Sequence, residues 1–236
     1  MKPILSLLQF TTVLPLGKPQ DLEHFARHSY LYPIAGYVIG GLVALPVYFI
    51  ANQTIAAAVA VALLFLITGA HHFDGLLDFG DGLMAHGNQE KRIAALTDRN
   101  VGAGAIALGI ATILLLFSGL RDSTSIVWVL IIGEVCAKFS MSFLTAYGAP
   151  FREGIHSYLH RFAHPGFPVI SFLFCLPLFL LPVSPEKIFS ALILMFICPV
   201  ILLGISRRLF GGVNGDVAGA SNEITRAIVI VAIALI

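Results

Sequence analysis

Residues 101–120 read VGAGAIALGIATILLLFSGL, twenty residues without a charged side chain. The hydrocarbon core of a bilayer is about 30 Å thick, and a helix of about 20 apolar residues crosses it. Five more largely apolar stretches qualify as spans: 31–50, 55–73, 125–147, 167–182 and 188–206. The sequence therefore predicts an all-α fold, a polytopic transmembrane helix bundle.

Both ends of the chain are apolar over shorter lengths. Residues 227–236 form a run of ten, which predicts either an interfacial helix or the start of a seventh span. Residues 4–16 follow Lys2, but no small-residue cleavage site comes after them, so they predict a helix on or entering the membrane surface rather than a signal peptide. We expect one integral membrane domain over residues 1–236, with six to seven spans.

The composition agrees with a membrane protein. Hydrophobic residues make up 58% of the 236 residues and charged residues only 11%, whereas soluble domains carry about 25% charged residues. This excludes a soluble globular enzyme, a disordered protein and a disulfide-stapled secreted one. The net charge of +1 predicts no nucleic-acid partner. The three cysteines stand inside apolar runs, which predicts buried free thiols.

The basic residues predict the orientation, because short loops rich in Lys and Arg stay on the cytoplasmic side. The loops on the opposite side hold only Arg121 and Lys187. The N-terminal segment and the loops on its side hold ten: Lys2, Lys18, Arg27, Lys91, Arg92, Arg99, Arg152, Arg161, Arg207 and Arg208. We expect a multi-pass protein of the cell membrane with a cytoplasmic N-terminus.

Three aspartates follow the second apolar stretch, in the segment 72–82, which reads HFDGLLDFGDG. Asp74, Asp78 and Asp81 are spaced i, i+4 and i+7, so a continuous helix places them on one face, within a wedge of about 60°. Their repulsion near a membrane boundary is costly, which favours a cation between them. Carboxylate oxygens suit Mg²⁺, with Mn²⁺ as the alternative. The other interpretation is a solvated acidic helix end.

Glycines 75, 80 and 82 are interleaved with these aspartates. Glycine lowers helix propensity, so its presence needs a compensating use. We expect these positions to let a bulky ligand or a neighbouring helix approach the backbone.

Two stretches on the predicted cytoplasmic side combine basic residues with glycines, and the motifs gather at about 72–104 and 207–223. In the first, Lys91 and Arg92 precede the segment 98–104, where a helix N-terminus beside cations favours an anion. The second opens with two arginines and continues with a flexible glycine loop and two acids, a set able to hold a nucleotide phosphate and its metal. The alternative for the second is a basic membrane anchor followed by a turn.

Two other patterns allow more than one interpretation. Glu134 and Lys138 stand i, i+4 inside an apolar stretch, which favours a structural ion pair in the bundle interior over a catalytic one. His156, His160 and His164 repeat every four residues, which favours a surface helix along the headgroups over a metal-binding stripe.

Two of these motifs resemble the cobalamin 5′-phosphate synthase family, also called adenosylcobinamide-GDP ribazoletransferase. Residues 72–82 are similar to the family pattern H-L-D-G-L-x-D-x-x-D-G, and residues 211–220, GGVNGDVAGA, are similar to G-G-x-T-G-D-x-x-G-A. Weaker similarity lies at 10–15, 32–36 and 98–104. The chain departs from the family at three positions and matches its Tyr–Arg–Gly stretch only loosely. The three positions are Asn100, Asn214 and Arg226, where Arg, Thr and a second acid are usual.

The resemblance implies a Mg²⁺-dependent transferase. Its substrates are adenosylcobinamide-GDP and α-ribazole or α-ribazole 5′-phosphate, and a ribose hydroxyl attacks the pyrophosphate to give adenosylcobalamin or its 5′-phosphate and GMP. The partners are these substrates and the lipid bilayer, and the active site faces the cytoplasm. Whether the chain forms a homo-oligomer stays open.

The sequence motifs described above and the family resemblance together predict roles for individual residues. Asp74, assisted by His72, orients or deprotonates the attacking hydroxyl. The predicted metal ligands are Asp74, Asp78, Asp81, Asp216 and Glu223. The predicted substrate-binding residues are Lys91, Arg92, Asp98, Arg99, Arg152, Arg207, Arg208, Gly211, Gly212, Asn214 and Gly215, with Arg207 and Arg208 as the main phosphate ligands.

Two other functions are alternatives. A CDP-alcohol phosphotransferase-like lipid enzyme also clusters aspartates at a helix end, but its signature has an Ala-Arg pair after the first Asp-Gly and a longer gap between carboxylates. A small-solute transporter usually has a polar path across the bilayer and often an internal repeat. The sequence has no such repeat, and its polar residues cluster on one side.

Overall fold

The protein is built from helices and the loops that join them. The computed structural model describes residues 2–236, and within that range β-pairing is limited to one isolated bridge between Pro150 and Val213. The all-α prediction is confirmed. The elements are α1 (Lys2–Thr11), α2 (Leu22–Ala26), the 3₁₀ helix η1 (Ser29–Leu31), α3 (Tyr32–Tyr48), α4 (Gln53–Thr68), α5 (His71–Met84), α6 (Gln89–Leu96), α7 (Ala103–Asp122), α8 (Ile126–Tyr147), α9 (Ile155–Phe162), α10 (Phe167–Leu173), the 3₁₀ helix η2 (Leu176–Leu180), α11 (Pro185–Phe210) and α12 (Gly215–Leu235).

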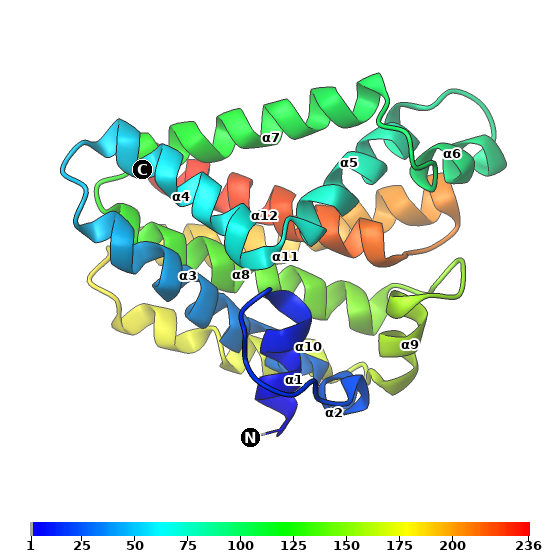
Figure 1. Ribbon diagram of the computed structural model, residues 1–236, viewed down its shortest axis with the longest axis horizontal. Helices are drawn as coiled ribbons and strands as arrows, with labels where there is room; N and C mark the ends of the chain where they lie inside the picture. The colour runs from blue at the N-terminus through cyan, green and yellow to red at the C-terminus, as the bar shows by residue number, and fades with distance from the viewer. Residues whose placement is uncertain (1) are drawn as a thin grey trace.

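Five helices are long and apolar enough to cross a membrane: Ser29–Tyr48, which joins η1 to α3, and α7, α8, α11 and α12. Two pairs of shorter helices are bent by 97° and 88° at their junctions, and they raise the number to seven if each pair is one broken span. The long helices run roughly along the longest axis of the molecule (Figure 1). The chain is therefore a multi-pass helical bundle, in agreement with the apolar pattern.

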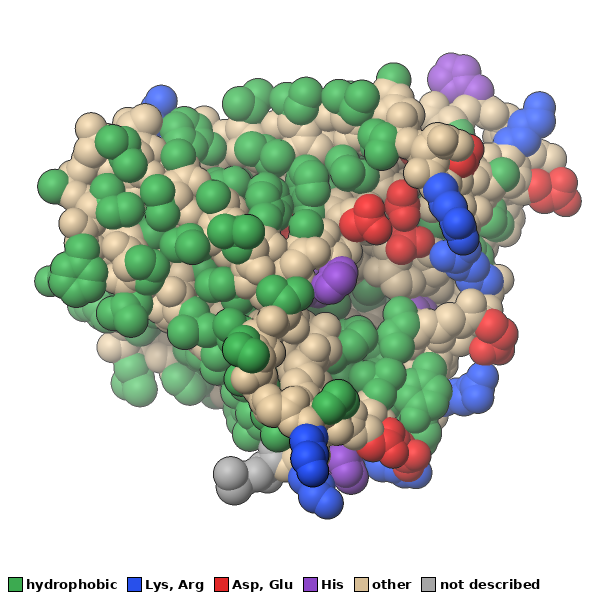
Figure 2. Space-filling view, viewed as in Figure 1, with side chains coloured by type: hydrophobic (Ala, Val, Ile, Leu, Met, Phe, Trp, Pro, Cys, Tyr) green, Lys and Arg blue, Asp and Glu red, His purple; other side chains and the backbone are tan. Residues whose placement is uncertain are grey.

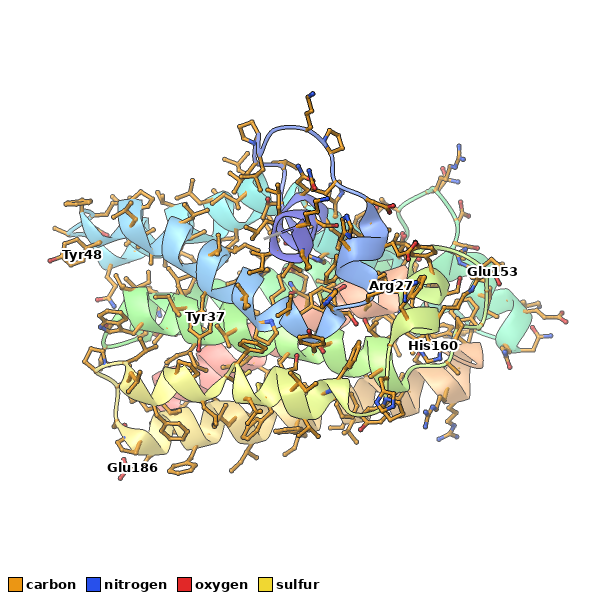
Figure 3. All side chains as sticks on the ribbon, turned by 90° about the horizontal axis from the view of Figure 1, so that it is seen from below. Arg27, Tyr37, Tyr48, Glu153, His160 and Glu186 are labelled. Carbon is orange, nitrogen blue, oxygen red and sulfur yellow. The ribbon has the colours of Figure 1, made fainter. Side chains whose placement is uncertain are left out.

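Charged side chains are unevenly distributed along this axis. Figure 2 shows hydrophobic side chains over most of one half of the visible face, and most acidic and basic side chains towards the other end. In Figure 3, Tyr48 and Glu186 lie at the apolar end, whereas Arg27, Glu153 and His160 lie at the opposite end. The bundle thus has one polar end, where loops and short helices collect.

Residues 55–73 do not form one helix, contrary to the prediction. α4 ends at Thr68, and Gly69 (φ +64°) and Ala70 (φ +56°) both adopt left-handed backbone conformations. Glycine suits such a helix end because it has no Cβ to clash, and the Ala70 N–H donates to Phe65 O at 3.0 Å. The three aspartates consequently share one helix, α5, which lies at 97° to the apolar α4.

Two further segments are divided or joined in ways that the apolar runs alone do not define. Residues 167–182 divide into the short α10 and the 3₁₀ helix η2, where Pro177 interrupts regular α-helical bonding. Residues 227–236 belong to the second half of the 21-residue α12, so the run ends a candidate span that begins at Gly215 and is neither a separate interfacial helix nor the start of a span. The glycine loop after α11 is short, because α12 already begins at Gly215 with Asn214 as its N-cap.

Glycines bring α5 close to two neighbouring helices. A Cβ placed on Gly80 would lie 2.8 Å from the backbone oxygen of Gly104 in α7. A Cβ placed on Gly75 would lie 2.8 Å from the backbone oxygen of Asp216 in α12. The expectation that these glycines admit a neighbouring helix is confirmed, and the contacts fix where α5 sits relative to α7 and α12.

Four charged side chains form a buried network between α8 and α12. Glu134 accepts from Arg226 Nη1 at 2.7 Å and lies 3.7 Å from Lys138 Nζ. Arg226 also pairs with Glu223, and Lys138 donates to Asn222 Oδ1 at 2.7 Å. The network holds two acids and two bases, so its formal charges cancel, and each side chain is at most 3% exposed. This arrangement agrees with structural stabilisation of the α8–α12 contact.

Two other sets of side chains are structural as well. Cys136, Cys175 and Cys198 are buried free thiols, as the sequence predicts. His156 and His160 on α9 bond to backbone oxygens at the end of α8, at 2.8 and 2.9 Å. These bonds tie α9 to α8 and occupy one nitrogen of each ring.

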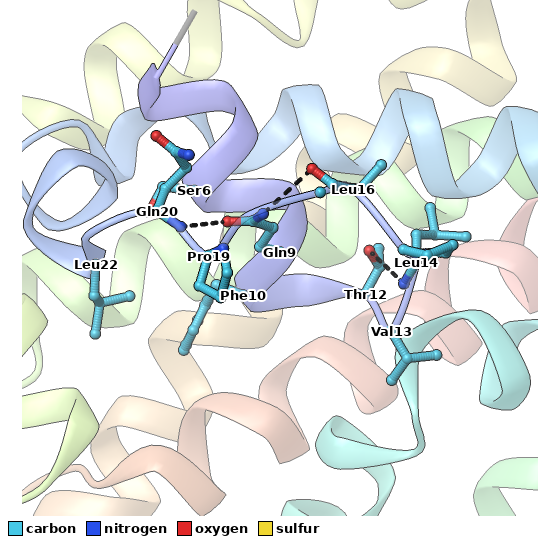
Figure 4. Close-up of a pocket in the computed structure, with 12 residues that line it drawn as sticks. Ser6, Gln9, Phe10, Thr12, Val13, Leu14, Leu16, Pro19, Gln20 and Leu22 are labelled. Carbon is cyan, nitrogen blue, oxygen red and sulfur yellow. Dashed lines mark hydrogen bonds between the residues drawn. The ribbon is translucent and has the colours of Figure 1, made fainter.

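A loop after α1 is anchored at both ends. Gln9 Oε1 accepts from the Gln20 N–H at 2.8 Å, and Gln9 Nε2 donates to Leu16 O at 3.4 Å (Figure 4). The Val13 N–H donates to Ile67 O in α4 at 2.9 Å. These bonds hold the end of α1 against the α4–α5 junction, next to the site described below.

Candidate active site

Five aspartates, four of them on helices, line one cavity of about 290 Å³ at the polar end of the bundle, which we call the aspartate cavity. Asp74, Asp78 and Asp81 come from α5, and Asp216 comes from the first turn of α12. In Figure 2 acidic side chains gather beside a hollow, with basic side chains along its outer edge. The remaining lining residues are Leu77, Thr97, Asp98, Arg99, Val101, Ala105 and Arg152.

Asp78 is an aspartate whose pKa is raised by its surroundings in the cavity. Its helix, α5, follows the 97° bend and is not one of the five long spans. Burial, and then the nearby carboxylates of Asp216, Asp74 and Asp81, raise the pKa of Asp78 from 3.8 to about 7. The negative charge of the cavity is therefore only partly compensated, which is the electrostatic condition that attracts a cation.

Asp81 is already engaged by the protein. Its Oδ2 accepts from the Gly102 N–H at 2.7 Å, and its Oδ1 accepts from the Ala105 N–H at 2.8 Å. Gly102 is the N-cap of α7 and Ala105 lies in its first turn, where the helix dipole favours an anion. The anion predicted at this helix N-terminus is thus the carboxylate of Asp81 itself.

Asp216 is held by residues on both sides of it. Asn214 caps α12 by accepting from the Val217 N–H at 3.1 Å, and its Nδ2 donates to Asp216 Oδ2 at 2.6 Å. Arg152 Nη2 lies 3.4 Å from the same oxygen. The Asn found where the family usually has Thr therefore caps the helix and also orients the carboxylate.

Backbone hydrogen bonds between the segment 149–151 and Val213 position Arg152 next to Asp216. The Val213 N–H donates to Ala149 O at 2.9 Å, and the Phe151 N–H donates to Val213 O at 3.4 Å. A Cβ on Gly212 would clash with Ala149 O, so only glycine allows these two loop segments to approach this closely. Gly212, predicted as a substrate-binding residue, thus supports the loop that carries Arg152.

Four of the predicted phosphate-binding cations lie outside the aspartate cavity. Arg92 donates to Gly82 O and Leu83 O at 3.3 and 2.8 Å, the last carbonyls of α5. Arg207 donates to Tyr147 O at 2.8 Å, at the end of α8. Lys91 and Arg208 are exposed and do not line the cavity either. The cations that do line it are Arg99 and Arg152.

Three more predicted site residues, Glu223, Gly211 and Gly215, also lie outside the aspartate cavity. Glu223 belongs to the buried network with Arg226 and does not line the aspartate cavity. Gly211, in a left-handed conformation (φ +80°), ends α11. Gly215 begins α12, and a Cβ there would lie 3.1 Å from Ile155. The positive φ of Gly211 and the close approach at Gly215 account for these two glycines without a ligand.

His72 lies two residues before Asp74 but faces a second cavity of about 400 Å³, which we call the histidine cavity. Asp216 borders both cavities. No site residue beyond His72, Gly215 and Asp216 was predicted in this wall. Phe10 and Tyr32 also line this cavity, and they belong to the segments 10–15 and 32–36 that show weaker similarity to the family. That similarity was the sequence feature that could have indicated them. The remaining lining residues are Gln9, His71, Met141, Thr145, Ile155, His156, Leu159, Ala218 and Gly219.

The donor atoms of the aspartate cavity are all oxygens, the type that Mg²⁺ and Mn²⁺ prefer. Over residues 2–236 no three His, Cys, Asp or Glu side chains are arranged so that they could hold one ion by themselves. Mg²⁺ is commonly held by one or two carboxylates together with substrate phosphates. The residues present fit that mode, with Asp74, Asp78 and Asp216 as the carboxylates not tied to a helix end.

Comparisons with known proteins show the family of this chain. The family model described as cobalamin-5-phosphate synthase matches residues 3–234. Proteins named adenosylcobinamide-GDP ribazoletransferase are similar along most of their length. The one from Archaeoglobus fulgidus is 35% identical over 96% of this chain and 94% of its own, the one from Methanococcoides burtonii is 32% identical over 94% and 87%, and the one from Deinococcus radiodurans is 36% identical over 90% and 78%. No solved structure matches. The chain belongs to the cobalamin-5-phosphate synthase family.

Proposed function

We propose that the protein transfers the adenosylcobinamide phosphate group of adenosylcobinamide-GDP to a ribose hydroxyl of α-ribazole or its 5′-phosphate, with release of GMP. The observation that carries the proposal is the convergence of Asp74, Asp78 and Asp216 with Arg99 and Arg152 in one cavity. This set suits a pyrophosphate, since the arginines match its oxygens and the carboxylates suit a bridging cation and a hydroxyl. The names of the relatives support the substrates.

The reaction exchanges one phosphorus–oxygen bond for another. The ribose oxygen bonds to the phosphorus that stays with cobinamide, and the bond from that phosphorus to the bridging oxygen breaks, so that GMP leaves with the electron pair. Asp74, which is exposed to the cavity, accepts the proton of the attacking hydroxyl. Arg99 and Arg152 bind the phosphates and hold them for in-line displacement.

Mg²⁺ is part of this proposal, with Mn²⁺ as a substitute. A bound divalent ion supplies charge neutralisation on the pyrophosphate. Asp78 and Asp216 would hold it, with Asp74 as a third carboxylate beside them. Asp81 has the smaller part, because both of its oxygens already accept backbone hydrogen bonds from α7.

We further propose that the protein resides in the cell membrane with this cavity on the cytoplasmic side. The support is the clustering of basic residues in the N-terminal segment and the loops on its side, ten against two on the other. Arg99 and Arg152, which line the cavity, are two of these ten.

One assay tests the proposal: detergent-purified protein, adenosylcobinamide-GDP and α-ribazole, with Mg²⁺ titrated from zero and GMP measured. We expect GMP and adenosylcobalamin in equal amounts, no product in EDTA, and recovery with Mg²⁺ or Mn²⁺. No GMP at any Mg²⁺ concentration contradicts the proposal. Uptake of a solute by proteoliposomes without any chemistry would favour the transporter alternative instead.

A further inference from the structure

We infer that the histidine cavity is the binding site for the flat heteroaromatic base of the acceptor nucleoside, a benzimidazole-type ring. This inference rests on the proposed function and assigns one of its two substrates to a place. The cavity is bounded by the end of α1 and by α3, α5, α8, α9 and α12, and its volume of about 400 Å³ lies in the range of small-molecule sites.

The wall is apolar on most sides. Phe10, Tyr32, Met141, Leu159 and Ala218 contribute rings, methyl groups and a thioether. A flat ring buried among such groups gains hydrophobic and dispersion energy without needing many hydrogen bonds.

Most polar side chains in the wall already have protein partners. Gln9 is bonded to the loop after α1, Thr145 Oγ1 donates to Met141 O at 2.8 Å, and His156 Nε2 is 2.8 Å from Gly148 O. His72 differs from these three, because its Nδ1 is buried without a hydrogen-bond partner and the residue is only 7% exposed. The cavity therefore suits a ligand with one or two polar ring atoms.

The other parts of the two substrates fit less well. Guanine carries several donors and acceptors along its edge, and because Gln9, Thr145 and His156 already bond within the protein, most of these atoms would stay unpaired here, which is costly. The corrin ring with its side chains is several times larger than a nucleoside base, so it exceeds a 400 Å³ cavity. A benzimidazole is flat, mostly apolar and polar only at its ring nitrogens.

The position of the cavity provides the link to the reaction. Asp216 borders both the histidine cavity and the aspartate cavity. His72 and Asp74 lie on the same helix, two residues apart, with one lining each cavity. A nucleoside with its base in the histidine cavity would therefore extend its ribose past Asp216 towards the carboxylates and the phosphates they help to bind.

Ile155 provides a test, because it lines the histidine cavity and is 42% exposed, so substitutions there should be tolerated by the fold. Ile155→Trp narrows the cavity, and Ile155→Ala removes part of its wall. We expect Ile155→Trp to raise the KM for α-ribazole at least about tenfold, as pocket mismatches do, with less than about twofold change in the KM for adenosylcobinamide-GDP. Ile110→Trp is the matched control, since Ile110 on α7 is 55% exposed and lines neither cavity.

A second measurement uses the unaltered protein. Benzimidazole should inhibit competitively against α-ribazole and not against adenosylcobinamide-GDP, and Ile155→Trp should weaken this inhibition. The inference is overturned if both Ile155 variants leave the KM for α-ribazole within about twofold, if they raise the KM for adenosylcobinamide-GDP instead, or if benzimidazole competes with adenosylcobinamide-GDP. In each case wild-type turnover would still support the proposed function. Absence of GMP from the wild-type protein would contradict the proposed function itself.

Discussion

The carboxylate of Asp81 accepts a hydrogen bond from the Gly102 N–H at 2.7 Å and so caps α7, a helix that follows Asp81 by more than twenty residues in the chain. Its second oxygen is bonded to the Ala105 N–H at 2.8 Å. One of the three regularly spaced aspartates therefore joins α5 to α7, whereas Asp74 and Asp78 have no such partner in the same cavity. Spacing along the helix made these three residues look equivalent, and their contacts distinguish them.

Replacement of Asp81 should mainly affect stability. Asp81→Ala removes both acceptors from the first turn of α7, and we expect a loss of about 1–3 kcal/mol in the free energy of unfolding. Asp81→Asn keeps one acceptor oxygen and should lose less. Thermal unfolding in detergent measures both. Equal stability of Asp81→Ala and wild type would contradict a capping role.

Asp74→Asn should affect activity and not stability, because Asp74 is exposed and accepts the proton in the proposed reaction. We expect GMP release to fall at least about 100-fold, the scale of general-base catalysis, with unchanged unfolding temperature. Glu186→Gln is the control, since Glu186 is an exposed carboxylate at the other end of the bundle. Near-normal turnover by Asp74→Asn would refute the assignment.

Arg152 and Arg208 are both predicted to bind substrate, and the structure places only Arg152 in the aspartate cavity. Arg152 lines the aspartate cavity 3.4 Å from Asp216, and Arg208 does not line it. Arg152→Ala should lower kcat/KM for adenosylcobinamide-GDP by about 10- to 100-fold through loss of a charged phosphate contact. Arg208→Ala should have a much smaller effect, and Arg121→Ala, in the last turn of α7 and outside the cavity, none. A larger loss for Arg208→Ala than for Arg152→Ala would contradict the assignment of phosphate binding to Arg152.

Gly75 should not tolerate a side chain. An alanine Cβ there would meet the backbone of Asp216 at 2.8 Å, so α5 and α12 would have to separate. We expect Gly75→Ala to cost about 1–3 kcal/mol of stability and to reduce turnover, because the two helices carry the carboxylates. Gly41→Ala in α3 is the matched control, since nothing lies within 4 Å of its added Cβ. That substitution should be neutral or stabilising by up to about 1 kcal/mol.

Arg226 should be essential for folding although it is outside both cavities. Arg226→Leu leaves Glu134 and Glu223 buried without their main partner, which typically costs about 3–5 kcal/mol. Ile228→Leu, an exposed neighbour on α12, should change stability by less than about 0.5 kcal/mol. Unfolding curves in detergent compare the two. A loss below about 1 kcal/mol for Arg226→Leu would mean that the network contributes little.

The helical part of the fold and half of the site were predictable from local sequence. Apolar stretches of about 20 residues predicted the long helices, and the i, i+4, i+7 spacing placed three aspartates on one face of α5. The bend at Gly69 and Ala70 was missed, because an apolar run continues through it and two left-handed residues change the helix direction without changing the composition. Most of the predicted phosphate-binding cations lie outside the aspartate cavity for a related reason, since Arg92 and Arg207 bond to helix ends that no local pattern relates to them.

The sequence by itself determined that this chain is helical, apolar enough for a membrane, and supplied with carboxylates at regular spacing, because each of these properties depends on residues only a few positions apart. The tertiary structure decided which acids and bases meet. Asp216 reaches the α5 aspartates only because glycines let α5 and α12 pack closely, and Arg152 reaches Asp216 only through the backbone contact of Ala149 with Val213. Such pairs form between segments far apart in the chain, so their positions follow from helix packing and not from spacing along the sequence.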